Sequence, residues 1–364
     1  MVCRALNELD DIAAENRRVL IAMDRRTDLD LAKEEFANLT LQSFDGRRSN
    51  FVRRVVATAL RERIDLVLIG HVNYGPLGVL LKRLQPQMRC GVIAYGMEVW
   101  SRLPRVRRRA LCSADFVVAI SEYTKAKLVE VQGVRAERVY IPPNAVAWKG
   151  AEQSAKGEGQ RATALRLLSV CRLDAAEQYK GIDTVIKALP AVRARVPDLE
   201  FVVVGSGSDL ERHKRLAADL GVADCVKFPG SVDERALRAA YESCDVFVLP
   251  SAGEGFGIVF LEAMNYCKPI IAANSGATPE VVKDGETGIL VEAGSVEQLA
   301  AAMIALGTNQ PERERMGAAG YARLQENFTF DHFKAKLREI MMRELPEPSL
   351  PEQKPFTTEG TEVL

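Results

Sequence analysis

The sequence predicts an α/β protein of two doubly wound domains, each built on a parallel sheet that helices cover. Its length of 364 residues suits two domains better than one. Short β-branched runs alternate with helical stretches along the chain, which is the pattern of strands buried on both faces of a parallel sheet. The polar stretch 149–161 has no apolar period and divides this series into two halves.

The first half is predicted to form an N-terminal domain over residues 1–148. Val2, Leu6, Leu9 and Ala13 lie on one helical face, so the chain opens with a helix. A doubly wound domain normally opens with a strand and a Gly-rich turn. Either this fold opens with a helix, or its first strand and loop are missing from this sequence. The strand-like runs are 18–23, 65–70, 91–94 and 115–120, and the clearest helices are 51–63 and 76–84.

A linker over 149–164 leads to the second predicted domain, residues 165–329. Its strand-like runs are 165–170, 201–204, 246–249 and 269–273. A helix is expected between 325 and 343, with Phe330, Phe333, Leu337 and Ile340 at helical spacing. As a separate C-terminal element, this helix is assigned to 330–345. This helix must pack on one of the two domains. The Pro-rich polar segment 346–364 is predicted to be a disordered tail.

Composition excludes several classes of protein. Lys+Arg and Asp+Glu both number 49, so a globally basic nucleic-acid binder is disfavoured and no nucleic-acid partner is expected. Apolar runs fall short of the roughly 20 residues that span a bilayer. The N-terminus lacks the shape of a signal peptide, so the expected compartment is the cytoplasm. The seven cysteines are scattered, which favours free thiols over a disulfide framework or structural zinc.

Several catalytic motifs are also absent or incomplete. Gly205-Ser206-Gly207 follows a predicted strand but lacks the third glycine of the dinucleotide fingerprint, so it is interpreted as a tight turn near a phosphate. The sequence contains no P-loop and no G-x-S-x-G motif. With only three histidines, a His-based metal site is not expected.

The most informative segment is the Gly-rich turn between a strand that ends near Pro250 and an apolar helix. It contains Glu254, Gly255, Phe256 and Gly257, and Glu262 follows about two helical turns later. Free backbone N–H groups at the positive end of a helix dipole form a seat for phosphate or another anion. Carboxylates accept hydrogen bonds from pairs of sugar or ribose hydroxyls. The alternative is a tight turn followed by one solvated helix glutamate.

A second constellation is cationic. Arg172 stands just past the strand 165–170, and Lys180 opens the next helix. Two cations at the carboxyl end of a strand can neutralise a diphosphate without a metal ion. The alternative is a pair of ordinary surface cations.

Taken together, these motifs resemble the nucleotide-sugar domain of GT-B glycosyltransferase family 4, whose members transfer sugars with retention. The resemblance is dense over 165–340 and weaker upstream, through 94–100, 120–124 and 141–144. No single motif carries it, but their joint order and spacing are specific. The motifs are Arg172 with Lys180, Gly205-x-Gly207, Glu254-x7-Glu262, Gly276-x-x-Pro279-Glu280-Val281-Val282 and Asp284-Gly285-x-Thr287-Gly288.

This resemblance implies a GT-B fold, in which two Rossmann-like domains face each other across a cleft. Arg172, Lys180 and Glu254 would be catalytic: the two cations would hold the donor diphosphate and Glu254 the donor sugar. Glu262 would bind the ribose, and the helix after Phe330 would cross back to the N-terminal domain. No cofactor or metal would be required beyond the nucleoside-diphosphate sugar itself. The remaining donor-binding positions would be Gly205, Gly255, Phe256 and Gly257.

The acceptor side is expected in the N-terminal domain, at His71, Tyr95 and Glu98. The family commonly has His-Gly where this chain has Tyr95-Gly96. A tyrosine hydroxyl can donate a hydrogen bond but is not a base near neutral pH. The expected function is retaining transfer of a sugar to an acceptor hydroxyl in the synthesis of a polysaccharide, glycolipid or other glycoconjugate. The alternative is a non-catalytic protein of the same fold that binds a nucleotide sugar as a scaffold or partner subunit.

The basic run Arg102–Arg109 has apolar neighbours. It could rest on anionic lipid near a lipid-linked acceptor, which would place the protein at the inner face of the membrane. The alternative is a solvated basic helix.

Overall fold

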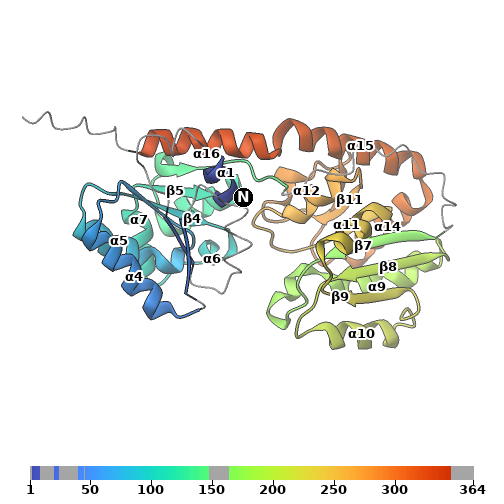
Figure 1. Cartoon of the computed structure of the whole chain (residues 1–364). Helices are drawn as coiled ribbons and strands as arrows, with labels where there is room; N and C mark the ends of the chain where they lie inside the picture. The colour runs from blue at the N-terminus through green and yellow to red at the C-terminus, as the bar shows by residue number, and fades with distance from the viewer. Residues whose placement is uncertain (1, 9–19, 24–39, 45, 147–163, 346–364) are drawn as a thin grey trace, which may run out of the picture.

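The computed structural model describes residues 2–8, 20–23, 40–44, 46–146 and 164–345. Figure 1 shows two α/β domains side by side, with the last two helices running along the same side of both. The predicted linker 149–164, apart from Ala164, and the predicted tail 346–364 lie outside the described residues. Within the described residues, no helix is both long enough and apolar enough to cross a membrane.

The N-terminal domain holds two parallel sheets in its described part. Helix α1 comes first, and β1 then pairs with β2, without a ladder to the four-stranded sheet, whose order is β3-β4-β5-β6. The strands are β1 Leu20–Met23, β2 Thr40–Ser43, β3 Leu66–Ile69, β4 Arg89–Ala94, β5 Phe116–Ala119 and β6 Val139–Tyr140. The helices used below are α1 Val2–Asn7, α4 Arg48–Arg61, α5 Gly75–Leu84, α6 Met97–Trp100, α7 Arg105–Ser113 and α8 Glu122–Lys127.

The C-terminal domain is built on one six-stranded parallel sheet of order β12-β11-β10-β7-β8-β9. The chain leaves β7 toward β8 and β9 and later returns to the other side of β7 with β10, so the strand order reverses between β7 and β10. Ligands of doubly wound sheets bind at the carboxyl ends of the strands beside such a reversal. The strands are β7 Leu165–Val170, β8 Leu199–Val204, β9 Val226–Gly230, β10 Val246–Leu249, β11 Ile270–Ala273 and β12 Gly288–Val291.

Helices cover both faces of this sheet, so its central strands are almost fully buried. All four residues of β10 and of β11 are buried, as expected for parallel strands in the middle of a sheet. The elements that matter for the site are the 3₁₀-helix η4 Ala175–Lys180 and the helices α9 Ile182–Arg193, α10 Leu210–Asp219, α11 Glu234–Ser243, α12 Ile258–Asn265, α13 Thr278–Val281, α14 Val296–Thr308 and α15 Gln310–Asn327.

The helix predicted between 325 and 343 is in fact two helices. Helix α15 ends at Asn327, and α16 (Phe330–Glu344) begins after Thr329, whose hydroxyl accepts a hydrogen bond from the His332 N–H. This cap satisfies a free N–H of the new helix, so the chain can change direction there. The crossover helix predicted at 330–345 is thus α16, whereas residues 325–327 of the broader range belong to the end of α15.

Helix α16 packs on the N-terminal domain. Its apolar side chains Phe333, Leu337, Ile340 and Met341 share one core cluster with residues of β4 and β5. At the end of the helix, the buried carboxylate of Glu344 accepts a hydrogen bond of 2.6 Å from the Tyr140 hydroxyl and pairs with Arg89. The chain thus finishes its C-terminal domain and then returns to the first one, which Figure 1 shows in red.

Candidate functional site

The predicted catalytic residues lie at the two strand ends that flank the reversal of strand order. Arg172 follows β7, and Glu254 follows β10. Lys180 ends η4, the short helix that follows Arg172. The sheet topology thus brings together residues that lie up to 82 positions apart in the sequence.

Lys180 and Glu254 form a largely buried ion pair. The Lys180 Nζ lies 2.7 Å from the Glu254 Oε1, and their side chains are 17% and 9% exposed. Burial alone would lower the pKa of Lys180, but the Glu254 carboxylate outweighs burial and raises it above its ordinary value. The ammonium is therefore held in its charged form at the place where a diphosphate is expected.

Arg172 is likewise paired with a carboxylate of its own loop. Its guanidinium contacts Glu177 of η4, while 73% of its side chain remains exposed. Glu177 is half-buried, and its Oε2 has no hydrogen-bond partner. The sequence analysis did not identify Glu177, because a glutamate in a polar loop carries no signal of its own.

Glycine allows the loop after β8 to pack closely against the loop after β7, which carries Arg172. Gly205 adopts a φ of +140°, and a Cβ there would lie 1.8 Å from the Cys171 carbonyl oxygen. The Leu173 N–H donates to the Ser206 carbonyl at 3.0 Å, and the Asp209 N–H donates to the Leu173 carbonyl at 2.7 Å. The loop after β8 therefore supports the loop that carries Arg172, which is a structural role for Gly205 beside the predicted donor contact.

The Gly-rich turn before α12 has the geometry of an anion seat. The N–H groups of Gly255, Phe256 and Gly257 have no acceptor within the described part of the chain. Gly257 has a φ of +86° and immediately precedes α12. Its carbonyl accepts from the Phe260 N–H at 2.9 Å, so among the described residues the N–H groups of Ile258 and Val259 are the ones left without a helical partner. The Phe256 ring is buried and packs edge-on against Phe328, so Phe256 can offer a ligand only its backbone.

Glu262 lies within α12, the helix that follows this turn, and its partner was not expected from the sequence. Its Oε2 accepts a hydrogen bond of 2.6 Å from the hydroxyl of Tyr241 in α11. Burial raises the pKa of Glu262, and the Tyr241 hydrogen bond offsets only part of this rise. Tyr241 was not identified from the sequence.

The predicted acceptor residues gather at the carboxyl ends of β3 and β4. The His71 ring lies 6.4 Å from the Tyr95 ring, measured between centroids. The His71 Nδ1 accepts from the Asn73 N–H at 3.1 Å, which leaves its Nε2 as the N–H-bearing nitrogen. The Glu98 Oε1 accepts from the Tyr95 N–H at 2.5 Å, and the Tyr95 side chain is exposed.

The acceptor loop touches the donor turn directly. A Cβ on Gly255 would lie 2.4 Å from the Tyr95 carbonyl oxygen, and one on Gly96 would lie 2.9 Å from the Gly255 Cα. Gly96 has a φ of +128°, so glycine is needed there for backbone reasons as well. The structure therefore brings Tyr95 and Gly96 beside Gly255, although they belong to different domains.

A second contact between the domains is polar. The Glu280 carboxylate of α13 accepts hydrogen bonds from the N–H groups of Glu122 and Tyr123, at 2.8 Å and 2.7 Å. These N–H groups open α8, so a C-terminal carboxylate caps a helix of the N-terminal domain.

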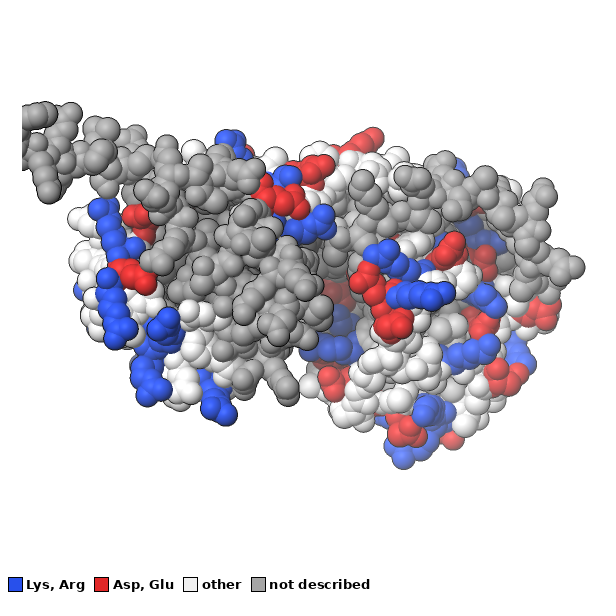
Figure 2. Space-filling view, in the orientation of Figure 1, with Lys and Arg blue, Asp and Glu red and all other residues white. Residues whose placement is uncertain are grey.

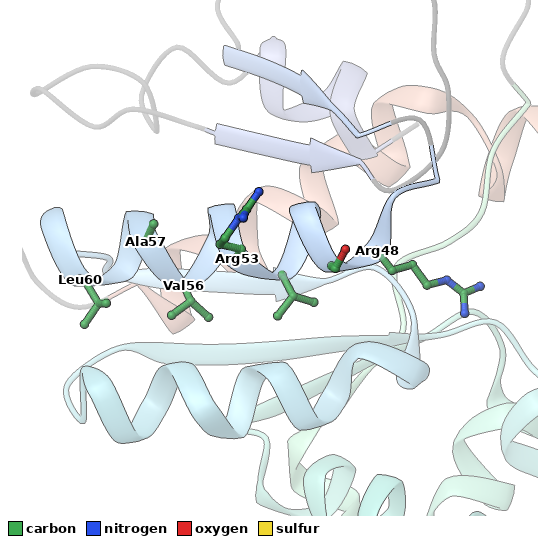
Figure 3. Close-up of a pocket in the computed structure, with 7 residues that line it drawn as sticks. Arg48, Arg53, Val56, Ala57 and Leu60 are labelled. Atoms are coloured by element: carbon green, nitrogen blue, oxygen red, sulfur yellow. The ribbon is translucent and has the colours of Figure 1, made fainter.

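One small hollow lies at the predicted donor site. A hollow of about 10 Å³, no more than the space of a single water, lies between the Arg172 loop and α10. An open groove of about 660 Å³ lies elsewhere, along the side of α4 shown in Figure 3. Its lining residues all belong to α4: Arg48, Ser49, Val52, Arg53, Val56, Ala57 and Leu60.

Comparison with known proteins agrees with this geometry. The profile of the family "Glycosyltransferase Family 4" matches residues 17–147, and that of "Glycosyl transferases group 1" matches residues 153–323. The chain is 36% identical over 306 residues to the GDP-mannose-dependent alpha-(1-6)-phosphatidylinositol monomannoside mannosyltransferase of Mycobacterium tuberculosis, with 80% of this chain and 78% of that protein covered. A mannosyltransferase of Corynebacterium glutamicum named for the monoacylated form of that acceptor is 30% identical over 307 residues, with 79% of each covered.

Solved structures support the fold. HepE from Anabaena, solved with UDP and glucose, has a TM-score of 0.76 at 20% identity, with 93% of this chain and 96% of that chain covered. Sucrose-phosphate synthase from Thermosynechococcus elongatus has a TM-score of 0.70 at 23% identity, with 81% and 77% covered. At these identities the likeness shows the fold alone.

The two parallel-sheet domains, the family profiles and the mannosyltransferase relatives define a GT-B enzyme that uses a nucleotide sugar. The chain belongs to glycosyltransferase family 4, and it is a glycosyltransferase. The resemblance, the fold class and the enzyme class expected from the motifs are thereby confirmed. The roles assigned to single residues stay predictions.

Proposed function

We propose that this enzyme transfers mannose from GDP-mannose to a hydroxyl of a phosphatidylinositol mannoside or a similar glycolipid, with retention of configuration. The choice of donor and acceptor rests on relatives up to 36% identical to this chain, which are named for these substrates. The single observation that carries the donor site is the start of α12. There, three backbone N–H groups without acceptors follow Glu254, the partner of Lys180.

Donor binding would exchange the partners of the two cations. Lys180 would move from Glu254 to the diphosphate, and Arg172 would move from Glu177 in the same way. The released Glu254 carboxylate would then accept hydrogen bonds from hydroxyls of the donor sugar. The free N–H groups of Gly255, Phe256 and Gly257 would complete the anion seat.

In the transfer step, the acceptor hydroxyl would attack the anomeric carbon from the face on which the diphosphate departs. The bond from that carbon to the phosphate oxygen breaks, the bond to the acceptor oxygen forms, and the acceptor proton passes to the departing phosphate. No protein base is required, which is compatible with Tyr95 in place of a histidine. Arg172, Lys180 and the α12 N-terminus would stabilise the charge on the leaving group without a metal ion.

A lipid-linked acceptor would require contact with a membrane surface. In the basic run 102–109, Arg105 and Arg107 are exposed, as is Val106, whereas Leu103 is buried and Arg108 is tied to the Gln132 carbonyl. Figure 2 shows further Lys and Arg side chains along the edge of the N-terminal domain formed by α4 and α5. We include in the proposal that this basic side of the domain rests on anionic lipid.

The test combines calorimetry with product analysis. GDP, UDP and ADP are titrated in EDTA, and GDP is expected to bind. Transfer from GDP-[13C]mannose to a phosphatidylinositol mannoside is then followed by NMR, and the product linkage is expected to be α. Binding only after addition of Mg²⁺ or Mn²⁺ would overturn the metal-independent mechanism, and a β-linked product would overturn retention.

A Glu254→Gln variant separates binding from turnover. Loss of the carboxylate frees Lys180 for the diphosphate, so GDP should bind as tightly as to the wild type or more tightly. Transfer should fall about a hundredfold or more, on the scale of one lost transition-state contact. A large loss of GDP affinity would show that Glu254 serves the nucleotide rather than the sugar.

A further inference from the structure

The carboxylate of Glu262 is held by a single neighbour, the hydroxyl of Tyr241. The hydrogen bond is 2.6 Å long and links α12 to α11. Among the described residues no Lys, Arg or His forms an ion pair with Glu262. A half-buried carboxylate without a cation is costly to maintain, and such a cost is commonly retained where a ligand needs the charge.

Tyr241 is held rigidly from the other side. Its side chain is completely buried, and its ring stacks against Tyr266, with centroids 5.9 Å apart and planes 6° apart, and against Phe247 of β10 at 5.8 Å. These contacts fix the direction in which the hydroxyl points. The hydrogen bond therefore fixes the direction of the carboxylate.

We propose that Tyr241 is a positioning residue for the nucleotide, which holds one oxygen of Glu262 so that the other faces the vicinal hydroxyls of the ribose. The inference rests on the proposed function, in which Glu262 contacts the ribose. The geometry supports it because Oε2 accepts from Tyr241, whereas Oε1 has no hydrogen-bond partner among the described residues and Glu262 is only partly buried. A phenylalanine would fill the same space but would leave the carboxylate free to rotate.

The experiment compares nucleotides with and without ribose hydroxyls. GDP and UDP, and their 2′,3′-dideoxy forms, are titrated by calorimetry against the full chain and against Tyr241→Phe and Glu262→Gln. Tyr140→Phe is a matched control. The Tyr140 hydroxyl also donates a 2.6 Å hydrogen bond to a buried glutamate, Glu344, but this pair lies at the N-terminal domain, away from the proposed nucleotide site. Melting temperatures of all variants identify any general loss of structure.

For Tyr241→Phe we expect the affinity for the ribonucleotide to fall about three- to tenfold, on the scale of one ordinary hydrogen bond, because the substitution loosens the carboxylate without removing it. The affinity for the dideoxynucleotide should not change, because that ligand does not reach Glu262. Glu262→Gln should show the same selectivity, and Tyr140→Phe should change neither affinity. Selectivity of this kind would not arise from a merely structural role of Tyr241.

Other outcomes distinguish failure of the Tyr241 positioning role from failure of the proposed function. Equal losses for both nucleotides in Tyr241→Phe would overturn the positioning role. A selective loss in Glu262→Gln without any in Tyr241→Phe would also overturn it while leaving the proposed function intact. No selective loss in Glu262→Gln would remove the ribose contact itself, and failure of GDP and UDP to bind the wild type would overturn the proposed function together with this inference.

Discussion

At the scale of single residues, each predicted donor-binding cation already has a carboxylate partner, Lys180 with Glu254 and Arg172 with Glu177. Without a ligand, the site is therefore close to neutral and its charges are satisfied. A diphosphate must compete with these carboxylates. We expect this competition to favour ligands that carry more than one negative charge, because a single charge would gain little over the existing pairs.

The Lys180–Glu254 pair predicts a coupling that a double-mutant cycle can measure. Lys180→Met leaves the buried Glu254 without its cation and should lower the free energy of unfolding by about 1–3 kcal/mol at pH 7. Lys180→Met combined with Glu254→Gln should recover most of that loss, yet neither variant should transfer sugar. Urea unfolding of the four forms is the measurement. Additive effects of the two changes would show that the pair is not coupled.

The raised pKa of Glu262 predicts a stability gain that depends on pH. Its pKa is higher in the folded chain than in the unfolded one, so the ionised carboxylate reduces stability above the folded pKa. Besides Glu262, the titratable groups that face its partner Tyr241 are Cys244 and Tyr266. Glu262→Gln should therefore raise the free energy of unfolding at pH 7 and should lose this advantage near pH 4, where the carboxyl group is protonated in both states. A variant no more stable than the wild type at pH 7 would contradict the argument.

At the scale of elements, the strands that could be predicted are those that carry the site. The runs 165–170 and 246–249 coincide with β7 and β10, because both are rich in apolar residues and lie mostly buried in the middle of the sheet, although β7 includes Arg166 and Ser169. The strands β2, β6, β9 and β12 were missed. β6 has only two residues, and β9 includes Pro229 and a charged Lys227, so neither shows an apolar run.

Side chains likewise divide into those that could be predicted from the sequence and those that could not. Arg172, Lys180, Glu254 and Glu262 could be chosen from the sequence because they fall at fixed offsets from strand ends and glycines. Tyr241, Glu177 and Glu280 become visible only when separate elements are brought together. Tyr241 and Glu262 are 21 positions apart on different helices, and no local pattern encodes their hydrogen bond.

The packing of α16 predicts that damage to this helix affects one domain more than the other. Leu337 is almost fully buried in the cluster with β4 and β5, so Leu337→Ala should destabilise the N-terminal domain by about 2–4 kcal/mol through lost burial and a residual cavity. GDP affinity, a property of the C-terminal domain, should change less than twofold. Calorimetric melting with and without GDP tests this, and Arg338→Ala on the exposed side of α16 is the control. A parallel loss of GDP affinity would show that α16 also supports the donor site.

At the scale of the whole molecule, the two domains meet where the acceptor loop approaches the donor turn. The close contact of Gly255 with the Tyr95 carbonyl admits no side chain, and Trp100 packs near Gly253 and Gly276. Glu280 adds two hydrogen bonds to the start of α8. Glycosyl transfer needs this arrangement, because water in an open cleft would compete with the acceptor for the donor sugar.

Glu280 therefore predicts how far turnover depends on the contact between the domains. Glu280→Gln keeps the size of the side chain but replaces a carboxylate that accepts from two N–H groups with a neutral amide that has one acceptor oxygen. Each charge-assisted hydrogen bond contributes about 1.5–3 kcal/mol, so the closed arrangement should lose at least tenfold in population relative to an open one. Turnover should fall by a similar factor. GDP affinity should stay within about twofold, because the Glu280 carboxylate bonds to N–H groups of the N-terminal domain and not to the groups proposed to hold the diphosphate. Small-angle scattering of the ligand-free variant should show a larger radius of gyration than the wild type.

Glu297→Gln, at an exposed position in the first turn of α14, is the control and should change none of these quantities. An unchanged scattering profile together with unchanged turnover would mean that the apolar and glycine contacts hold the domains together without Glu280.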